Sequence, residues 1–133
     1  MPHLNWLAVL AAAVSTFALG GLWYSPVLFG RTWMSANNLD EADLAKSNMA
    51  KIFGLALLLA VIMAANLAAF LAEPKTTAAW GATAGFLAGF GWVALGIATI
   101  ALFERRSWKY ILINGGYMTV SFTVMGLIIG AWR

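Results

Sequence analysis

Residues 76–103 read TTAAWGATAGFLAGFGWVALGIATIALF, and no charged side chain interrupts them. A helix needs roughly 20 apolar residues to cross about 30 Å of hydrocarbon, so this run is long enough to span a bilayer. Its glycines at 81, 85 and 89 recur every four residues and therefore share one helix face. Small residues at this spacing let helices approach closely in lipid. The stretch predicts a transmembrane helix with a closely packed face.

Three further charge-free runs cover 4–29, 52–72 and 110–132. Their apolar residues are continuous and do not alternate, which argues against a β-barrel. The first run lacks a basic leading segment and is too long for a cleaved signal peptide, so we expect it to be retained. We predict an all-α integral membrane bundle in a single domain, with transmembrane helices near 4–24, 51–72, 77–103 and 109–131.

The composition restricts the chemistry. The chain has 133 residues, of which 62% are hydrophobic and 10% charged, whereas soluble domains carry about 25% charged residues. With no cysteine and one histidine, disulfides, thiolate sites and typical zinc or haem sites are excluded, and no cofactor or metal is expected. The net charge of +3 is scattered around the apolar runs instead of forming one basic face, so nucleic acid is not expected as a partner.

The distribution of lysine and arginine predicts the orientation. Six basic residues lie in the first and third connecting loops, and two lie on the other side: Arg31, Lys46, Lys51, Arg105, Arg106 and Lys109 against Lys75 and Arg133. Basic loops stay in the cytoplasm. We expect a bacterial inner-membrane protein with loops one and three in the cytoplasm and both termini outside.

Loop one is the only extramembrane segment with recognisable structure. Asn38 followed by Glu41 fits a capping box, and acidic residues in the next turn favour a helix start. We therefore expect a short polar helix near 39–50, on the cytoplasmic side, that runs into the second span. A solvated lead-in to that span is the favoured interpretation, and a surface for a protein partner, whose identity the sequence leaves unknown, is the alternative.

Small residues at a four-residue period occur in all four spans, as in a glycine zipper. The candidates for close helix packing are Gly81, Gly85, Gly89, Gly115 and Gly126. Such rows of small residues can pack against another helix of the same chain or against a helix of a second copy. We expect membrane lipid and a second copy of the chain as partners, and hence a homo-oligomer.

Chemistry-bearing residues are sparse within the spans. No ionisable group lies in the middle of any of them, which argues against proton-coupled antiport through an embedded carboxylate. An enzyme acting on a lipid headgroup would have to use Glu104 with Arg105 and Arg106, but a basic anchor explains these three residues better. Asn66 and Asn114 are expected to bridge helices by hydrogen bonds; the alternative is a polar lining for a narrow pathway.

Residues 23–34 read WYSPVLFGRTWM and follow the first span. Tryptophan, tyrosine and arginine are typical of the membrane interface, and Pro26 should end or kink the helix at Ser25. An aromatic belt explains the composition but not why proline and glycine fall between the aromatics.

This stretch and residues 102–132, LFERRSWKYILINGGYMTVSFTVMGLIIGAW, carry two specific patterns: W-Y-S-P-x-x-F-G-x-x-W-M, and F-E-x-R followed by I-N-x-G-Y and M-G. On these residues the chain resembles, over nearly its whole length, the bacterial membrane family known as domain of unknown function 1761. The resemblance implies a small four-span membrane protein and no activity or substrate. The matching positions are Trp23, Tyr24, Ser25, Pro26, Phe29, Gly30, Trp33, Asn114, Gly116, Tyr117, Met125 and Gly126.

Both patterns begin at the same membrane face in the predicted topology, so spans one and four can converge there. The candidate ligand-binding residues are Trp23, Tyr24, Trp33, Asn114 and Tyr117. An aromatic-lined pocket is the functional hypothesis, and an aromatic lock that fastens loop one under the bundle is its structural rival. The leading function is an oligomeric binder or conductor of a small solute, ion or lipid. An accessory subunit that docks a partner through loops one and three is the alternative.

Overall fold

The computed structural model describes residues 4–132, a range in which it contains helices and no strand. The single histidine, His3, and Arg133, which was counted among the basic residues, lie outside the described residues. The helices are α1 (Trp6–Trp23), α2 (Gly30–Ala36), α3 (Glu41–Ala45), α4 (Met49–Phe70), α5 (Ala78–Ala88), a π-helical segment η1 (Gly89–Ala94), α6 (Leu95–Phe103) and α7 (Trp108–Ala131).

Within that range four helices are long and apolar enough to cross a membrane. They are α1, α4, the continuous rod α5–η1–α6 (Ala78–Phe103) and α7, and each begins and ends within two residues of an apolar range given above. The all-α membrane fold predicted from the sequence is confirmed. Large apolar side chains cover the outside, while small ones such as Ala12, Ala13 and Ala64 are fully buried between helices, as expected of helices that associate in lipid.

Each long helix begins at a residue whose side chain caps it. Asn5, Asn48, Thr77 and Ser107 each accept a hydrogen bond from a backbone N–H of the first turn. These residue types are preferred at helix starts because their oxygens satisfy N–H groups that have no partner within the helix. Polar residues at the ends of the apolar runs therefore set where the helices begin.

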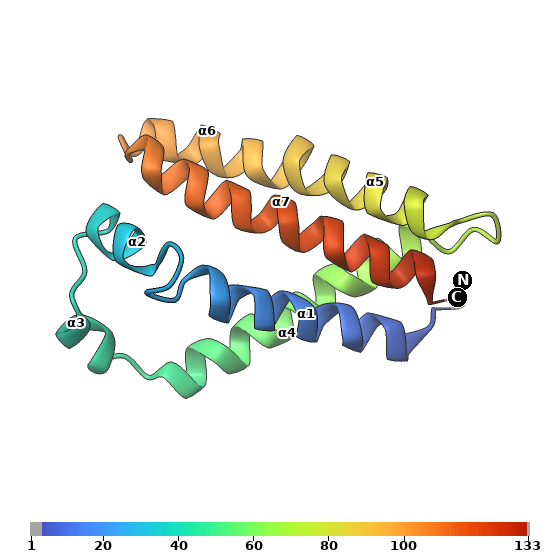
Figure 1. Ribbon diagram of the computed structural model, residues 1–133, viewed down its shortest axis with the longest axis horizontal. Helices are drawn as coiled ribbons and strands as arrows, with labels where there is room; N and C mark the ends of the chain where they lie inside the picture. The colour runs from blue at the N-terminus through green and yellow to red at the C-terminus, as the bar shows by residue number, and fades with distance from the viewer. Residues whose placement is uncertain (1–3, 133) are drawn as a thin grey trace.

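The four rods do not form a symmetric bundle. In Figure 1 the rod α5–η1–α6 lies along α7, α1 lies on the other side of α7, and α4 crosses α1 at an angle. α4 packs mainly on α1, touches α7 less and hardly touches α5, the next helix in sequence. Every residue from 45 to 59 is exposed. The first half of α4 therefore leaves the bundle.

The glycine row of α5 and η1 lies against α7. A Cβ atom at Gly81 would overlap the carbonyl oxygen of Gly126, and one at Gly85 would overlap that of Phe122. A Cβ at Gly89 would lie 2.9 Å from the carbonyl oxygen of Met118. The contact of Gly115 with Ala94 is looser, at 3.3 Å for an added Cβ. The backbones of the α5–η1 segment and of α7 thus meet within one chain, and this contact already covers the glycine row.

Loop one differs from the expectation of one helix near 39–50. It contains two short helices, and residues 46–48 separate α3 from α4. The predicted capping box on Asn38 and Glu41 is wrong: Asp40 caps α3, with Asp40 and Asp43 exchanging side-chain-to-backbone hydrogen bonds of 2.8 and 3.0 Å. Asn38 instead has a φ of 55°, a left-handed conformation that asparagine tolerates and that turns the chain before α3.

Candidate functional site

The turn between α1 and α2 explains the proline and glycine of WYSPVLFGRTWM. α1 ends at Trp23, and the Ser25 carbonyl accepts hydrogen bonds from the N–H groups of Leu28 (3.1 Å) and Gly30 (2.9 Å). A Cβ at Gly30 would overlap the backbone of Tyr24 and Ser25. The proline thus follows the last helical residues, and the glycine lets the chain fold back beneath them.

This turn places its aromatic side chains against α7. The Tyr24 hydroxyl donates to Asn114 Oδ1 at 2.6 Å, and Trp23 Nε1 donates to the Ile113 carbonyl at 2.9 Å. From the other direction, the Tyr117 hydroxyl of α7 donates to the Thr16 carbonyl of α1 at 2.9 Å. Three hydrogen bonds across about 90 to 100 residues of sequence therefore join α1 to α7.

Ring contacts complete this group. The Tyr24 ring packs edge-on against both Trp33 (5.5 Å between centroids) and Tyr117 (5.3 Å), and the Trp23 ring lies 6.4 Å from that of Tyr117. The structure thus brings together all five residues proposed from the sequence; we call them, with Asn114 as the only non-aromatic member, the aromatic cluster.

The polar atoms of the aromatic cluster bond mainly to one another or to backbone. The hydroxyls of Tyr24 and Tyr117 and the indole N–H of Trp23 are donors already in use. Such satisfied groups fix geometry, and α2 is held to α7 through Trp33. These contacts support the role of a lock, while the assignment of the five residues to ligand binding stays a prediction.

A groove that sequence reasoning missed lies between α4 and the rod α5–η1–α6. It has a volume of about 640 Å³. Met63, Asn66 and Phe70 of α4 form one wall, and Trp80, Leu87 and Trp92 form the other. Phe122 of α7 contributes to the floor. The groove exists because α4 diverges from α5, a feature that no local pattern in the sequence indicates.

Asn66 is the one polar side chain in the lining of this groove. It is exposed, and among the described residues its amide makes no hydrogen bond. The interhelical bond expected of both asparagines is therefore found for Asn114 and not for Asn66, since α4 presents Asn66 to the open groove. An amide without a partner at membrane depth is costly, because hydrocarbon offers it no hydrogen bond.

The comparisons with known proteins identify the family. Residues 7–130 match the family model described as "Protein of unknown function (DUF1761)". The chain belongs to this family. The family resemblance inferred from the sequence is thereby confirmed. No curated protein and no solved structure matches the chain.

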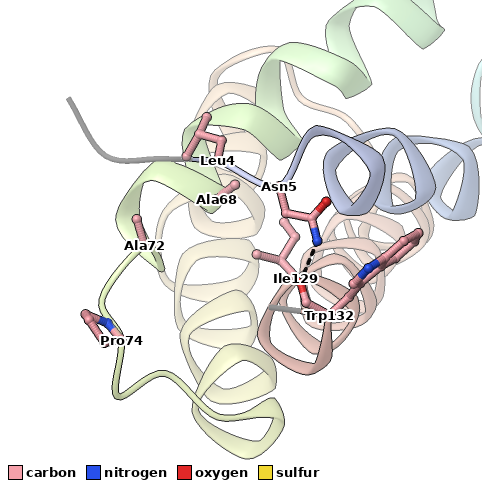
Figure 2. Close-up of a pocket in the computed structure, with 7 residues that line it drawn as sticks. All are labelled: Leu4, Asn5, Ala68, Ala72, Pro74, Ile129 and Trp132. Atoms are coloured by element: carbon pink, nitrogen blue, oxygen red, sulfur yellow. Dashed lines mark hydrogen bonds between the residues drawn. The ribbon is translucent and has the colours of Figure 1, made fainter.

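A second cavity of this DUF1761 protein lies where the start of α1 meets the end of α7. It has a volume of about 250 Å³ and is lined by Leu4, Asn5, Ala68, Ala72, Pro74, Ile129 and Trp132. Figure 2 shows Asn5 donating to the carbonyl oxygen of Trp132, over 3.2 Å. This bond ties the first residues of α1 to the end of α7.

The acidic and basic residues considered for an enzyme lie at the end of α6 and just before α7. No group of three or more His, Cys, Asp or Glu side chains there could hold a metal ion. Glu104 is exposed at the end of α6, and the guanidinium of Arg106 lies 5.0 Å from the centre of the Tyr110 ring. A cation held over a tyrosine ring at a helix start suits an anchor at the membrane surface.

Proposed function

We propose that this protein is a membrane-embedded binding protein for one amphiphilic molecule that enters sideways from the bilayer. The site is the groove between α4 and the rod α5–η1–α6. The observation that carries the proposal is the unpartnered amide of Asn66 in an otherwise apolar groove of about 640 Å³. Apolar pockets with few polar groups are the usual form of small-molecule sites.

The geometry of the groove indicates how such a molecule would lie. Asn66 precedes the last residue of α4 by four positions, which places it about 6 Å below the end of that helix. Trp92 lies twelve positions after Trp80, which is about 18 Å along the rod towards its middle. A polar head at Asn66 and an apolar tail reaching Trp92 would therefore satisfy both the amide and the apolar walls.

The π-helical segment η1 supports the same site. It lies at the deep end of the groove and contributes Trp92 and Val93 to the lining. Interruptions of this kind are frequent at functional sites, and they turn side chains out of the regular helical register. None of α1, α4, α5–η1–α6 and α7 contains Asp or Glu, so the binding proposed here involves no proton coupling through a carboxylate.

A brominated long-chain alcohol tests the proposal, because bromine quenches tryptophan fluorescence at short range and Trp80 and Trp92 line the groove. Wild-type protein in phosphatidylcholine nanodiscs should show saturable quenching. Ala88→Phe, which fills the groove, should abolish the saturable part, whereas Ala79→Phe, exposed on the same helix outside the groove, should retain it.

A further variant tests the hydrogen bond proposed for the Asn66 amide. Asn66→Leu should weaken binding of the brominated alcohol about three- to tenfold, as expected for one lost hydrogen bond. The same variant should bind the corresponding brominated alkane as wild type does. Quenching that does not saturate, or that Ala88→Phe and Ala79→Phe change equally, would contradict the proposal.

An accessory role is the second candidate, and the exposure of residues 45–59 favours it. This stretch joins α3 to the first half of α4, where the Phe53 ring packs edge-on against Phe17 of α1 with 5.6 Å between centroids. A partner helix would cover it. We also retain the orientation deduced from the basic residues, with loops one and three in the cytoplasm and the bacterial inner membrane as location.

A further inference from the structure

A third cavity, of about 470 Å³, lies beside the aromatic cluster, at the end of the bundle where α2 meets the start of α7. Its lining consists of two cationic side chains, three hydroxyls and one methyl group: Arg31, Lys109, Thr32, Ser35, Ser107 and Ala36. No acidic residue contributes to it. We call it the basic cavity.

The aromatic cluster determines the shape of the basic cavity. α2 is only seven residues long and would not hold a fixed position alone. It is fixed by Trp33, which packs on Tyr24, which in turn donates to Asn114 of α7. Arg31 and Ser35 are four residues apart and so share the face of α2 that is turned to the start of α7.

The charges of the basic cavity are uncompensated. Among the described residues, neither Arg31 nor Lys109 forms an ion pair. In loop one, the carboxylates of Asp40 and Asp43 bond to the backbone at the start of α3. The basic cavity therefore presents two positive charges and several hydroxyl donors.

We propose that the basic cavity binds a phosphate group, either in the headgroup of an anionic phospholipid or in a phosphorylated solute. A phosphate has several oxygens that accept hydrogen bonds from different directions, and here donors come from two separate helices. The Arg31 guanidinium can engage two oxygens at once, while Lys109 supplies a second charge and the hydroxyls of Thr32 and Ser35 complete the set.

The position of the basic cavity fits a phosphate at the membrane surface. It adjoins the end of α1 and the start of α7, where the exposed Trp108 marks the level of the headgroups. Basic pockets between membrane helices at this level bind anionic lipid headgroups. The groove of the proposed function is a separate site, because its Asn66 lies near the last residue of α4 and none of its lining residues lines the basic cavity. The present inference therefore stands independently of that proposal.

Native mass spectrometry of the intact protein in neutral detergent tests the inference with two probes titrated separately, phosphatidylglycerol and glycerol 3-phosphate. We expect a discrete first binding event for at least one of them. The pair Arg31→Gln and Lys109→Gln should weaken it about tenfold or more, as expected for lost charge-assisted hydrogen bonds. The matched pair Lys46→Gln and Lys51→Gln removes the same charge from exposed positions outside the cavity and should change it less than twofold.

The probes distinguish the source of the phosphate: binding of phosphatidylglycerol alone indicates a lipid headgroup, and binding of glycerol 3-phosphate indicates a solute. Arg31→Lys keeps the net charge and should still weaken binding several-fold, because lysine lacks the planar fork of arginine. This variant also serves if the double variant fails to fold. Equal loss in the two charge-removing pairs, wild-type affinity in Arg31→Lys, or no first binding event with either probe would each overturn the inference.

Discussion

Tyr24 connects more of the structure than any other side chain of the aromatic cluster. Its hydroxyl bonds to Asn114, and its ring contacts Trp33 on one side and Tyr117 on the other. One residue therefore joins α1, α2 and α7. The tyrosine two residues before the proline in WYSPVLFGRTWM matters because the turn directs it inward, whereas a belt residue would face the headgroups.

We expect Tyr24→Phe to destabilise the protein by about 1 kcal/mol, since it removes one interhelical hydrogen bond and leaves the Asn114 oxygen without its donor. The ring contacts remain. Denaturation in mixed detergent, followed by circular dichroism, measures the change. Tyr110→Phe is the control, because the Tyr110 hydroxyl forms no hydrogen bond among the described residues; equal effects of the two variants would contradict the role given to Tyr24.

At the scale of helices, the charge-free apolar runs were sufficient to predict the four long helices. The aromatic cluster was also predictable, because Pro26 and Gly30 indicate a turn and both sequence patterns begin at one face. The divergence of α4 from α5 could not be predicted, because it depends on which small residues of α4 pack against another helix. Ala60 and Ala64 are buried, whereas Ala56 is exposed. All three alanines belong to the same four-residue repeat, so the repeat does not indicate which of them is buried.

The π-helical segment and α2 were also missed. No residue of GFGWVA at 89–94 excludes a regular helix, so the wider turn has no local signature. No helix was predicted at 30–36, because seven residues with a glycine first have little intrinsic tendency to form a helix. The packing of Trp33 on Tyr24, which bonds to Asn114 of α7, stabilises it. Both features arise from packing between elements that are distant in the sequence.

The α5–α7 contact leads to a second prediction. Gly85→Leu should destabilise the fold by at least about 2 kcal/mol, because the new side chain meets the backbone of α7 at Phe122 and helices cannot separate there without losing neighbouring contacts. Thermal unfolding in detergent, read by size-exclusion chromatography, measures this. Gly96→Leu, in the same rod with nothing within 4 Å of an added Cβ, should be neutral or slightly stabilising. Similar losses in both variants would refute close packing as the cause.

At the scale of the whole molecule, the internal use of the glycine ridge limits how copies can associate. Gly81, Gly85 and Gly126 already meet within one chain, so an interface between copies has to use another surface. The first half of α4 offers one, with exposed Gly54 and Ala56 and no contact within 4 Å of a Cβ added at Gly54. Small residues on an uncovered helix allow a second helix to approach.

We therefore predict a discrete homo-oligomer that associates through the first half of α4. Native mass spectrometry of protein released directly from its membrane vesicles should show it. Gly54→Leu should shift the population towards monomer, because the added side chain separates two helices that meet at the glycine. Gly96→Leu, equally free of neighbours in the monomer, should leave the oligomer intact. A monomeric wild-type protein would exclude self-association. An oligomer that persists in Gly54→Leu would show that the contact lies elsewhere, and residues 45–59 would then remain available to a different protein partner.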